Sequence, residues 1–347
     1  MKSKQIKTYV GADLHKDCTH FIAQDKAGKE IASRKMDNNG VMFREFLSGL
    51  PQPVKVIVES TSNWAWFCQE VKAGGHEVMV AHARETSAKS ETREKNDPLD
   101  ARLLATLLRG NLLKKECWQA PPEILRTRER LRYMQFLSRQ KVSNKNRIHS
   151  ILIRLNIKCP HKDVFCKGGR KFLRSLDIAP EYKAGITRSL ELIERIEASL
   201  SEDLEFCRRM AQEDTLVGIL TTMPGVSAQL ACMIRFETGD VDRFERAEAY
   251  VNYTGLVPGK RSSSEHSKEI GVTKEGSFWL RWAFVQAAQT ADRQKKGRLS
   301  AFFWKQYRKT RNRNKAIVAT AREMAVIAYH MMRRKQEYYE PAMFVCQ

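Results

Sequence analysis

Four acidic residues in the N-terminal third of the chain have the spacing of a metal site. Asp13 ends an apolar stretch, and Glu59 follows the largely β-branched run 54–58. Asp97 and Asp100 lie three positions apart, so both would lie on one face of a helix beginning there. Converging carboxylates repel each other unless cations neutralise them. Two bound Mg²⁺ ions can stabilise the attacking and leaving oxygens of a phosphate displacement. The pattern therefore favours metal-dependent phosphate chemistry.

Each of these residues alone has a simpler interpretation. Asp97 could be a helix N-cap, with Asp100 in the position of a capping box, and for this pair taken alone the cap is favoured. Asp13 could be an ordinary turn residue. A carboxylate that ends an apolar strand, as Glu59 does, is harder to explain structurally. The four together, in this order, outweigh the structural interpretation.

Serines among cations form the second candidate site, within Lys260-Arg261-Ser262-Ser263-Ser264 and followed by Lys268. A serine flanked by cations suits nucleophilic attack on phosphorus, because the cations bind the phosphate and stabilise its developing charge. On composition alone, a flexible Ser/Lys-rich loop between Val257 and Thr273 is the favoured interpretation.

Two further segments indicate nucleic-acid contact. Pro224-Gly225-Val226 lies between helical stretches and resembles a helix-hairpin-helix, whose backbone amides face a DNA phosphate. A plain turn between helices explains it about as well. Residues 302–307 interleave aromatic side chains with cations, which suits base stacking or an ordinary core with a solvated face.

The elements that must position the carboxylates are read from hydrophobic periodicity. We predict strands over 8–14, 19–24, 54–58 and 78–81, a further strand after the turn at 26–29, and helices over 41–50, 64–73 and 99–109. This order is typical of an α/β nuclease-like domain of the ribonuclease H type.

The remainder is predicted to be mainly helical. Leu125, Leu131, Met134 and Leu137 indicate one long helix, and Ile186, Leu190, Ile193, Ile196 and Leu200 indicate another. Pro160 and the pair Gly168-Gly169 are interpreted as interruptions between them. A helical hairpin or coiled-coil insert follows, with a helical region beyond Thr215.

The composition agrees with a partner that is a polyanion. The 61 Lys and Arg exceed the 40 Asp and Glu, for a net charge of +21. Nucleic acid is favoured, because each neutralised phosphate releases a counterion and no apolar anchor accompanies the cations. No apolar run approaches membrane-spanning length, so no membrane partner is expected. The eight cysteines lack zinc-ligand spacing, and a reducing cytoplasm is the expected location.

Three motifs resemble one known family: Gly11-Ala12-Asp13, Val58-Glu59-Ser60-Thr61, and Asn96-Asp97-Pro98-Leu99-Asp100-Ala101-Arg102. They are similar to the Asp-Glu-Asp-Asp set of the insertion-sequence one-hundred-and-ten family of transposases, related to Piv-like DNA invertases. The resemblance extends through the helical region and covers nearly the whole chain. It implies a RuvC-like domain over 1–115, a helical coiled-coil linker over 116–210, and a transposase domain over 211–347.

The resemblance also implies the roles of the site residues. Asp13, Glu59, Asp97 and Asp100 would hold Mg²⁺ or Mn²⁺, and a serine in the block after Gly255 would attack DNA. Spacing from Gly255 favours Ser263, with Ser262 second. The family usually has Gly directly after its serine, where this chain has Ser264, so the choice among the three serines stays open. Phosphate contacts are expected from the set Gly225, Lys260, Arg261, Lys268 and Lys274.

The partners implied are donor and target DNA, a structured non-coding guide RNA, and further copies of the chain, as a dimer or as a tetramer on DNA. Base pairing with the RNA would then select the sequence. Two alternatives stay open: a metal-only junction resolvase or structure-specific nuclease, and a catalytically inactive nucleic-acid-binding protein.

Overall fold

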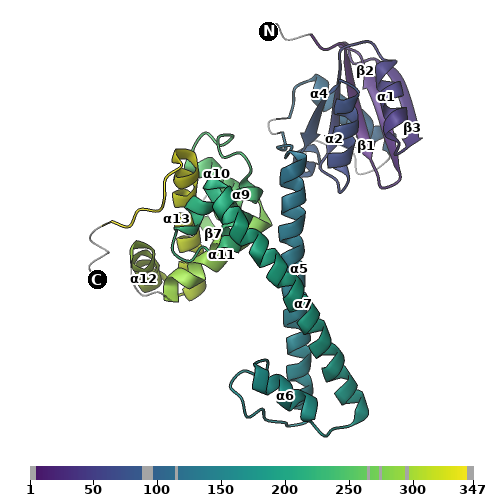
Figure 1. Ribbon diagram of the computed structural model, residues 1–347. Coiled ribbons are helices and arrows are strands. Elements are labelled where there is room, and N and C mark those ends of the chain that lie inside the picture. The colour runs from purple at the N-terminus through teal and green to yellow at the C-terminus, as the bar shows by residue number, and fades with distance from the viewer. Residues whose placement is uncertain are drawn as a thin grey trace. The chain divides into compact units, whose positions relative to one another are not determined.

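The computed structural model describes residues 5–87, 97–113, 116–263, 266–272, 276–293 and 297–341 of the chain. It divides into two compact units, Met1–Ala120 and Pro121–Gln347. The first is a mixed α/β unit and the second is mainly helical, as the sequence predicts (Figure 1). Within the described residues, no helix combines the length and the apolar character needed to cross a bilayer.

The first unit is built on a five-stranded sheet with the order β3-β2-β1-β4-β5. The strands are β1 Thr8–Leu14, β2 Cys18–Gln24, β3 Glu30–Asp37, β4 Val54–Glu59 and β5 Glu77–Ala81. β1 pairs antiparallel with β2 and parallel with β4. β4 pairs parallel with β5. The carboxyl ends of β1, β4 and β5 therefore lie at the same edge of the sheet.

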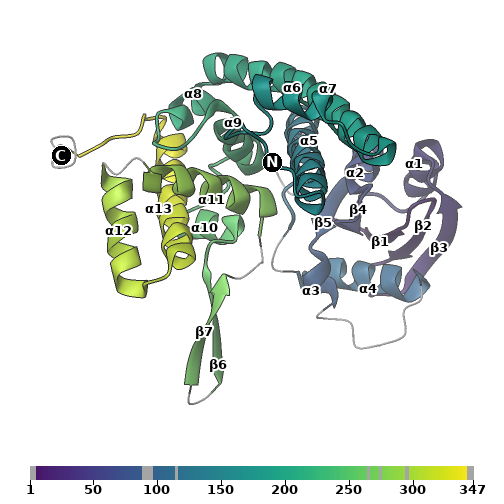
Figure 2. The same cartoon turned by 90° about the horizontal axis from the view of Figure 1, so that it is seen from below.

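Helices cover both faces of this sheet, with α1 and α2 on one side and α4 on the other (Figure 2). The helices among the described residues of this unit are α1 Gly40–Ser48, α2 Trp64–Ala73, α3 Ala83–Ser87 and α4 Asp97–Arg109. Strand residues alternate between the faces: Val10, Ala12 and Val58 belong to the core under α1 and α2. Ile57 belongs to the core under α4, which also contains Leu104 and Leu107. The two-faced burial explains why 54–58 is apolar apart from Lys55, which is partly exposed and pairs with Glu77.

Gly11 allows α4 to lie directly on β1. A Cβ atom at this position would lie 2.0 Å from the Ala101 carbonyl oxygen and 2.6 Å from the Ala105 backbone nitrogen. Both are helix backbone atoms that cannot rotate away. The glycine of the Gly11-Ala12-Asp13 motif is thus required by close packing.

Gly11→Ala is expected to destabilise the first unit by about 1–3 kcal/mol or more, the usual cost of overpacking a close-packed contact. Calorimetry would detect this as a lower melting temperature. Gly49→Ala is the matched control, because a Cβ there meets only ordinary contacts at 3.5 and 3.6 Å and φ is −72°. Equal melting temperatures for the two variants would contradict this packing role.

The second unit begins with two long helices, α5 Pro122–Arg154 and α7 Pro180–Glu213, with α6 Lys167–Ser175 between them in the chain. Buried residues from all three share one core at the end of this hairpin: Ile148, Ile151, Leu152, Leu173, Ile186, Leu190 and Ile193. The predicted long helices are confirmed. Pro160 and the pair Gly168-Gly169 lie between α5 and α7, as predicted, and the two glycines are in the first turn of α6. Gly169 is buried there, and a Cβ on it would lie 2.2 Å from the Val164 carbonyl oxygen.

The remaining helices surround a larger core: α8 Thr215–Thr221, α9 Ala228–Thr238, α10 Ala247–Thr254, α11 Phe278–Arg293, α12 Arg298–Thr310 and α13 Arg313–Arg334. The prediction of a loop between Val257 and Thr273 is wrong. The described residues of this segment form an antiparallel hairpin of β6 Pro258–Ser263 and β7 His266–Val272. These strands are rich in Ser and Lys and lack an apolar alternation, so periodicity gave no signal for them.

Candidate active site

The sheet places two of the predicted carboxylates on neighbouring strands. Ala12 of β1 is in register with Val58 of β4, and Asp13 and Glu59 are the next residues along these two strands. Alternation puts Asp13 on the same face as Gly11, which is the face that α4 covers. Glu59 follows Ile57 on that face in the same way. The two acidic residues therefore share one face and one edge of the sheet, as predicted.

Helix α4 brings the second pair of carboxylates to this edge. Asp97 and Asp100 both lie in its first turn. The packing of α4 on Gly11 places the start of the helix beside the carboxyl end of β1. Residues far apart in the sequence thereby meet at Asp13.

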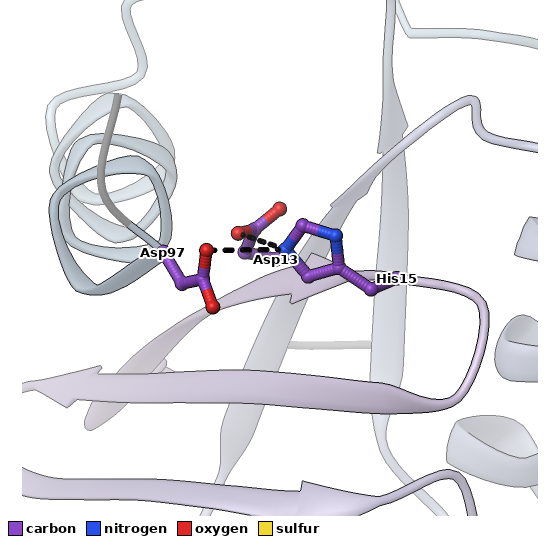
Figure 3. Close-up of side chains that lie close together, drawn as sticks. All are labelled: Asp13, His15 and Asp97. Carbon is purple, nitrogen blue, oxygen red and sulfur yellow. Dashed lines mark hydrogen bonds and ion pairs between the residues drawn. The ribbon is translucent and has the colours of Figure 1, made fainter. Parts of the chain in front are cut away.

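A histidine outside the predicted set of site residues contacts two of these aspartates through one ring nitrogen (Figure 3). His15 Nε2 is 2.9 Å from Asp13 Oδ2 and 3.5 Å from Asp97 Oδ1. The other carboxylate oxygen of Asp97 accepts a hydrogen bond of 2.8 Å from Lys35 Nζ of β3. One donor atom from each of Asp13, His15 and Asp97 lies within 4.8 Å of the others. Among the described residues, this is the group whose geometry could hold a metal ion.

The pKa values of Asp13 and Asp97 are shifted in opposite directions. Burial raises the pKa of Asp13, contact with His15 opposes this, and the charges of Asp100 and Asp97 add to the rise. The hydrogen bond from Lys35 lowers the pKa of Asp97. The exposed Lys35 has a raised pKa for the same reason. An anionic site whose charge Lys35 compensates only in part is one that a cation would stabilise.

Glu59 has a different immediate environment. Its Oε1 accepts a short hydrogen bond from the hydroxyl of the buried Thr86 in α3, and that hydroxyl also contacts the Ala83 carbonyl oxygen. His15 thus links Asp13 and Asp97. The charge of Asp100 raises the pKa of Asp13. Glu59, at the end of the neighbouring strand, contacts α3 instead.

The donor set fits a divalent cation. Carboxylate oxygens are the preferred ligands of Mg²⁺, and an imidazole nitrogen is a common ligand of transition metals. Asp13 has 21% of its side chain exposed and His15 has 48%, so the group reaches the protein surface.

The serine candidates lie in the second unit. Ser263 is the last residue of β6 and is in register with His266 of β7, while Ser262 pairs with Ser267. The cations of the predicted set lie on the same hairpin, Lys260 and Arg261 on β6 and Lys268 on β7. Ser264 and Lys274 lie outside the described residues.

The Pro224-Gly225-Val226 segment connects α8 to α9, as predicted. Gly225 has φ of 85°, a conformation that favours glycine. Ser227 caps α9 by accepting a hydrogen bond from the Leu230 N–H. In the aromatic segment, Phe303 is buried and Trp304 is 42% exposed, so α12 contributes to both core and surface.

The sequence contains a signal for one of the two site residues that were not predicted, His15, and none for the other, Lys35. His15 follows Asp13 by two positions, directly after the last residue of β1, so its nearness to Asp13 in the sequence was an available signal. Lys35 lies on the outer strand β3, and its contact with Asp97 depends on where α4 packs. Nothing in the sequence indicates that contact.

Comparison with known proteins gives consistent matches along the chain. A family model described as "Transposase", the DEDD type of IS110, matches residues 10–157. A second, "Transposase IS116/IS110/IS902 family", matches residues 217–303. The chain is 25% identical over 338 residues to the transposase of insertion sequence IS1328 from Yersinia enterocolitica, covering 93% of this chain and 96% of that one. It is 22% identical over 354 residues to the transposase of IS1111A from Coxiella burnetii, covering 96% and 92%.

Proposed function

This chain belongs to the IS110 family of transposases, enzymes that cut and rejoin DNA, and on that basis we propose that its carboxylate cluster and Ser263 act together in strand exchange. The observation that carries the proposal is the meeting of Asp13 and Asp97 from distant parts of the sequence. DEDD transposases use a divalent metal ion, and Mg²⁺ or Mn²⁺ is the ion we propose here.

The proposed architecture is a RuvC-like domain over 1–115, a coiled-coil linker over 116–210 and a transposase domain over 211–347. The sheet order, with an antiparallel hairpin beside three parallel strands, supports the ribonuclease H-type assignment of the first domain. The long helices α5 and α7 support a helical linker, and the β6–β7 hairpin and the α8–α9 turn lie in the third segment.

Asp13, Glu59, Asp97 and Asp100 are proposed to hold the metal against the scissile phosphate. When bound, the cation supplies charge stabilisation to the phosphate oxygens during displacement. Lys35 would hold Asp97 Oδ2 and leave Oδ1 directed toward Asp13 and His15. Thr86 would fix the Glu59 carboxylate in the same way.

Ser263 is the proposed nucleophile. Its Oγ forms a bond to phosphorus while the bond from phosphorus to the deoxyribose 3′-oxygen breaks, and the serine proton passes to that leaving oxygen. The product is a phosphoserine and a free 3′-hydroxyl. Attack by another strand's 3′-hydroxyl reverses the step and regenerates the serine. No external energy source is needed, because one phosphoester bond replaces another.

Nucleic-acid binding is proposed at Gly225, Lys260, Arg261, Lys268 and Lys274, chiefly to backbone phosphates. A structured guide RNA from the element, and assembly into a dimer or a tetramer on DNA, complete the proposal. Sequencing of the nucleic acid that copurifies with the chain would test for the RNA and would also provide the DNA ends needed as substrates.

Trapping a protein–DNA adduct tests the proposed chemistry. With labelled DNA and Mg²⁺, we expect a covalent adduct that survives denaturing electrophoresis. Metal-dependent nicking without an adduct would favour the alternative, a metal-only resolvase or nuclease. Tight binding without cleavage would favour an inactive binding protein.

Binding is expected to depend steeply on salt. With about 6–10 phosphate contacts, affinity should fall about 10³–10⁵-fold between about 50 and 200 mM salt. Lys260→Gln and Arg261→Gln should each reduce the slope of log affinity against log salt by about 0.9. Lys55→Gln is the control, because Lys55 is outside the proposed binding set and its Nζ lies 3.8 Å from Glu77 Oε2. The slope should therefore stay the same. A nearly flat salt dependence would mean that the +21 charge has another purpose.

A further inference from the structure

His15 contacts two aspartates of the cluster, Asp13 and Asp97, through a single nitrogen. Its Nε2 lies 2.9 Å from Asp13 Oδ2 and 3.5 Å from Asp97 Oδ1 (Figure 3). Adjacent ligands of an octahedral cation with bonds of about 2.1 Å lie about 3 Å apart. The two separations from Nε2 are therefore close to those of neighbouring ligands around one ion, and one donor atom from each of the three residues lies within 4.8 Å of the others.

The backbone of His15 is held in place from three directions. Its carbonyl oxygen accepts hydrogen bonds from the amide of Asn38, after β3, at 2.9 Å and from the amide of Asn63, before α2, at 3.0 Å. Its N–H donates to the Cys18 carbonyl oxygen at 2.9 Å across the β1–β2 turn. These bonds fix the backbone from which the imidazole reaches the two aspartates, and 48% of the side chain is exposed.

The two oxygens of Asp97 have separate partners. Oδ2 accepts the hydrogen bond from Lys35, and Oδ1 faces His15. Lys35 thus orients the carboxylate so that one oxygen points to the same place as His15 Nε2 and Asp13 Oδ2. The three donors come from a strand, its turn and a helix, and all face one point.

We propose that His15 is a direct metal ligand through Nε2, beside Asp13 and Asp97. This inference rests on the proposed carboxylate metal site and adds to it a nitrogen donor that the four carboxylates alone would lack. Mg²⁺ prefers an all-oxygen set, whereas imidazole suits transition metals. His15 would accordingly shift the preference of the site from Mg²⁺ toward Mn²⁺.

Electron spin echo spectroscopy with Mn²⁺ as the probe tests this directly on the full-length protein. We expect nitrogen modulation from a coordinated imidazole, and its loss in His15→Gln. Mn²⁺ affinity should fall by at least about tenfold in that variant, since even outer-shell partners contribute about 10–100-fold. Mg²⁺ affinity, measured by competition, should fall less.

His20→Gln is the matched control. His20 is the cross-strand partner of Asp13 in the sheet, but its Nε2 contacts the Ser33 hydroxyl at 3.1 Å. We expect His20→Gln to keep the nitrogen modulation. Unmutated protein grown with ¹⁵N-histidine should show the modulation shifted to the ¹⁵N frequency, which removes dependence on the folding of any variant.

The outcomes separate this inference from the proposed function. Mn²⁺ bound without nitrogen modulation, or with modulation that persists in a folded His15→Gln, would overturn the role of His15 and leave the carboxylate site standing. Mn²⁺ binding that is unchanged by Asp13→Asn would instead contradict the metal site, and the ligand role of His15 with it.

Discussion

Replacing Asp13 or Asp97 by alanine is expected to abolish strand cleavage while DNA binding stays intact. A metal ion contributes several kcal/mol to a phosphate displacement, so loss of its ligands should slow cleavage by about 10³-fold or more. Asp100→Ala and Glu59→Ala should have the same direction of effect. Binding should be unchanged or slightly tighter, because the cations remain and carboxylate repulsion of phosphate falls. Cleavage of labelled DNA and a binding titration on the same preparations provide the measurement.

Glu77→Ala is the control for these variants. Glu77 begins β5 at the opposite edge of the same sheet, and 68% of its side chain is exposed. Its removal should leave cleavage unaffected. If Asp97→Ala and Asp100→Ala both recombine normally, the pair has only the role of a helix cap, and the four-carboxylate cluster is wrong.

The strands and helices that carry the carboxylates could be predicted because their patterns are local. The bounds of β1 and α2 agree with the predicted ranges 8–14 and 64–73. The largely β-branched run 54–58 predicted β4, because a strand covered on both faces is mainly apolar. Since parallel strands end at one edge, the proximity of Asp13 and Glu59 followed from the strand assignments alone.

The contacts within the cluster could not be predicted in the same way. The His15–Asp97 contact depends on α4 packing against β1, which in turn requires the absence of a side chain at Gly11. Periodicity places a residue on a face but does not determine how far along that face a distant helix lies. Gly11 marks the point where α4 contacts β1, but the sequence alone does not show that a helix packs there.

The β6–β7 hairpin escaped prediction for a different reason. Its strands contain Ser, Lys, Arg and Gly, residues with little preference for sheet, and no apolar face marks them. Backbone pairing from Pro258 with Val272 to Ser263 with His266 defines the hairpin. Composition therefore indicated a loop where the chain forms paired strands.

Ser263→Ala is expected to remove both the covalent DNA adduct and recombination. A serine hydroxyl is a poor nucleophile at neutral pH, so it needs a base or a metal to take or polarise its proton. For this reason Asp13→Ala should abolish the adduct as well. Ser267→Ala on the facing strand is the control and should keep activity. A fully active Ser263→Ala would refute the assignment and make Ser262 the next candidate.

Mixing the two inactive proteins tests whether one active site is shared between protomers. Suppose that the carboxylates of one chain act with the serine of its partner. In a mixed dimer of Asp13→Ala and Ser263→Ala chains, one composite site would then carry both substitutions and the other would carry neither. Some recombination should return on mixing, although each protein alone is inactive. If both groups instead act within one chain, every site in the mixture lacks either its carboxylate or its serine, and no activity should return. Absence of rescue in mixed oligomers verified by mass spectrometry, with both variants folded, would thus count against a site shared between protomers.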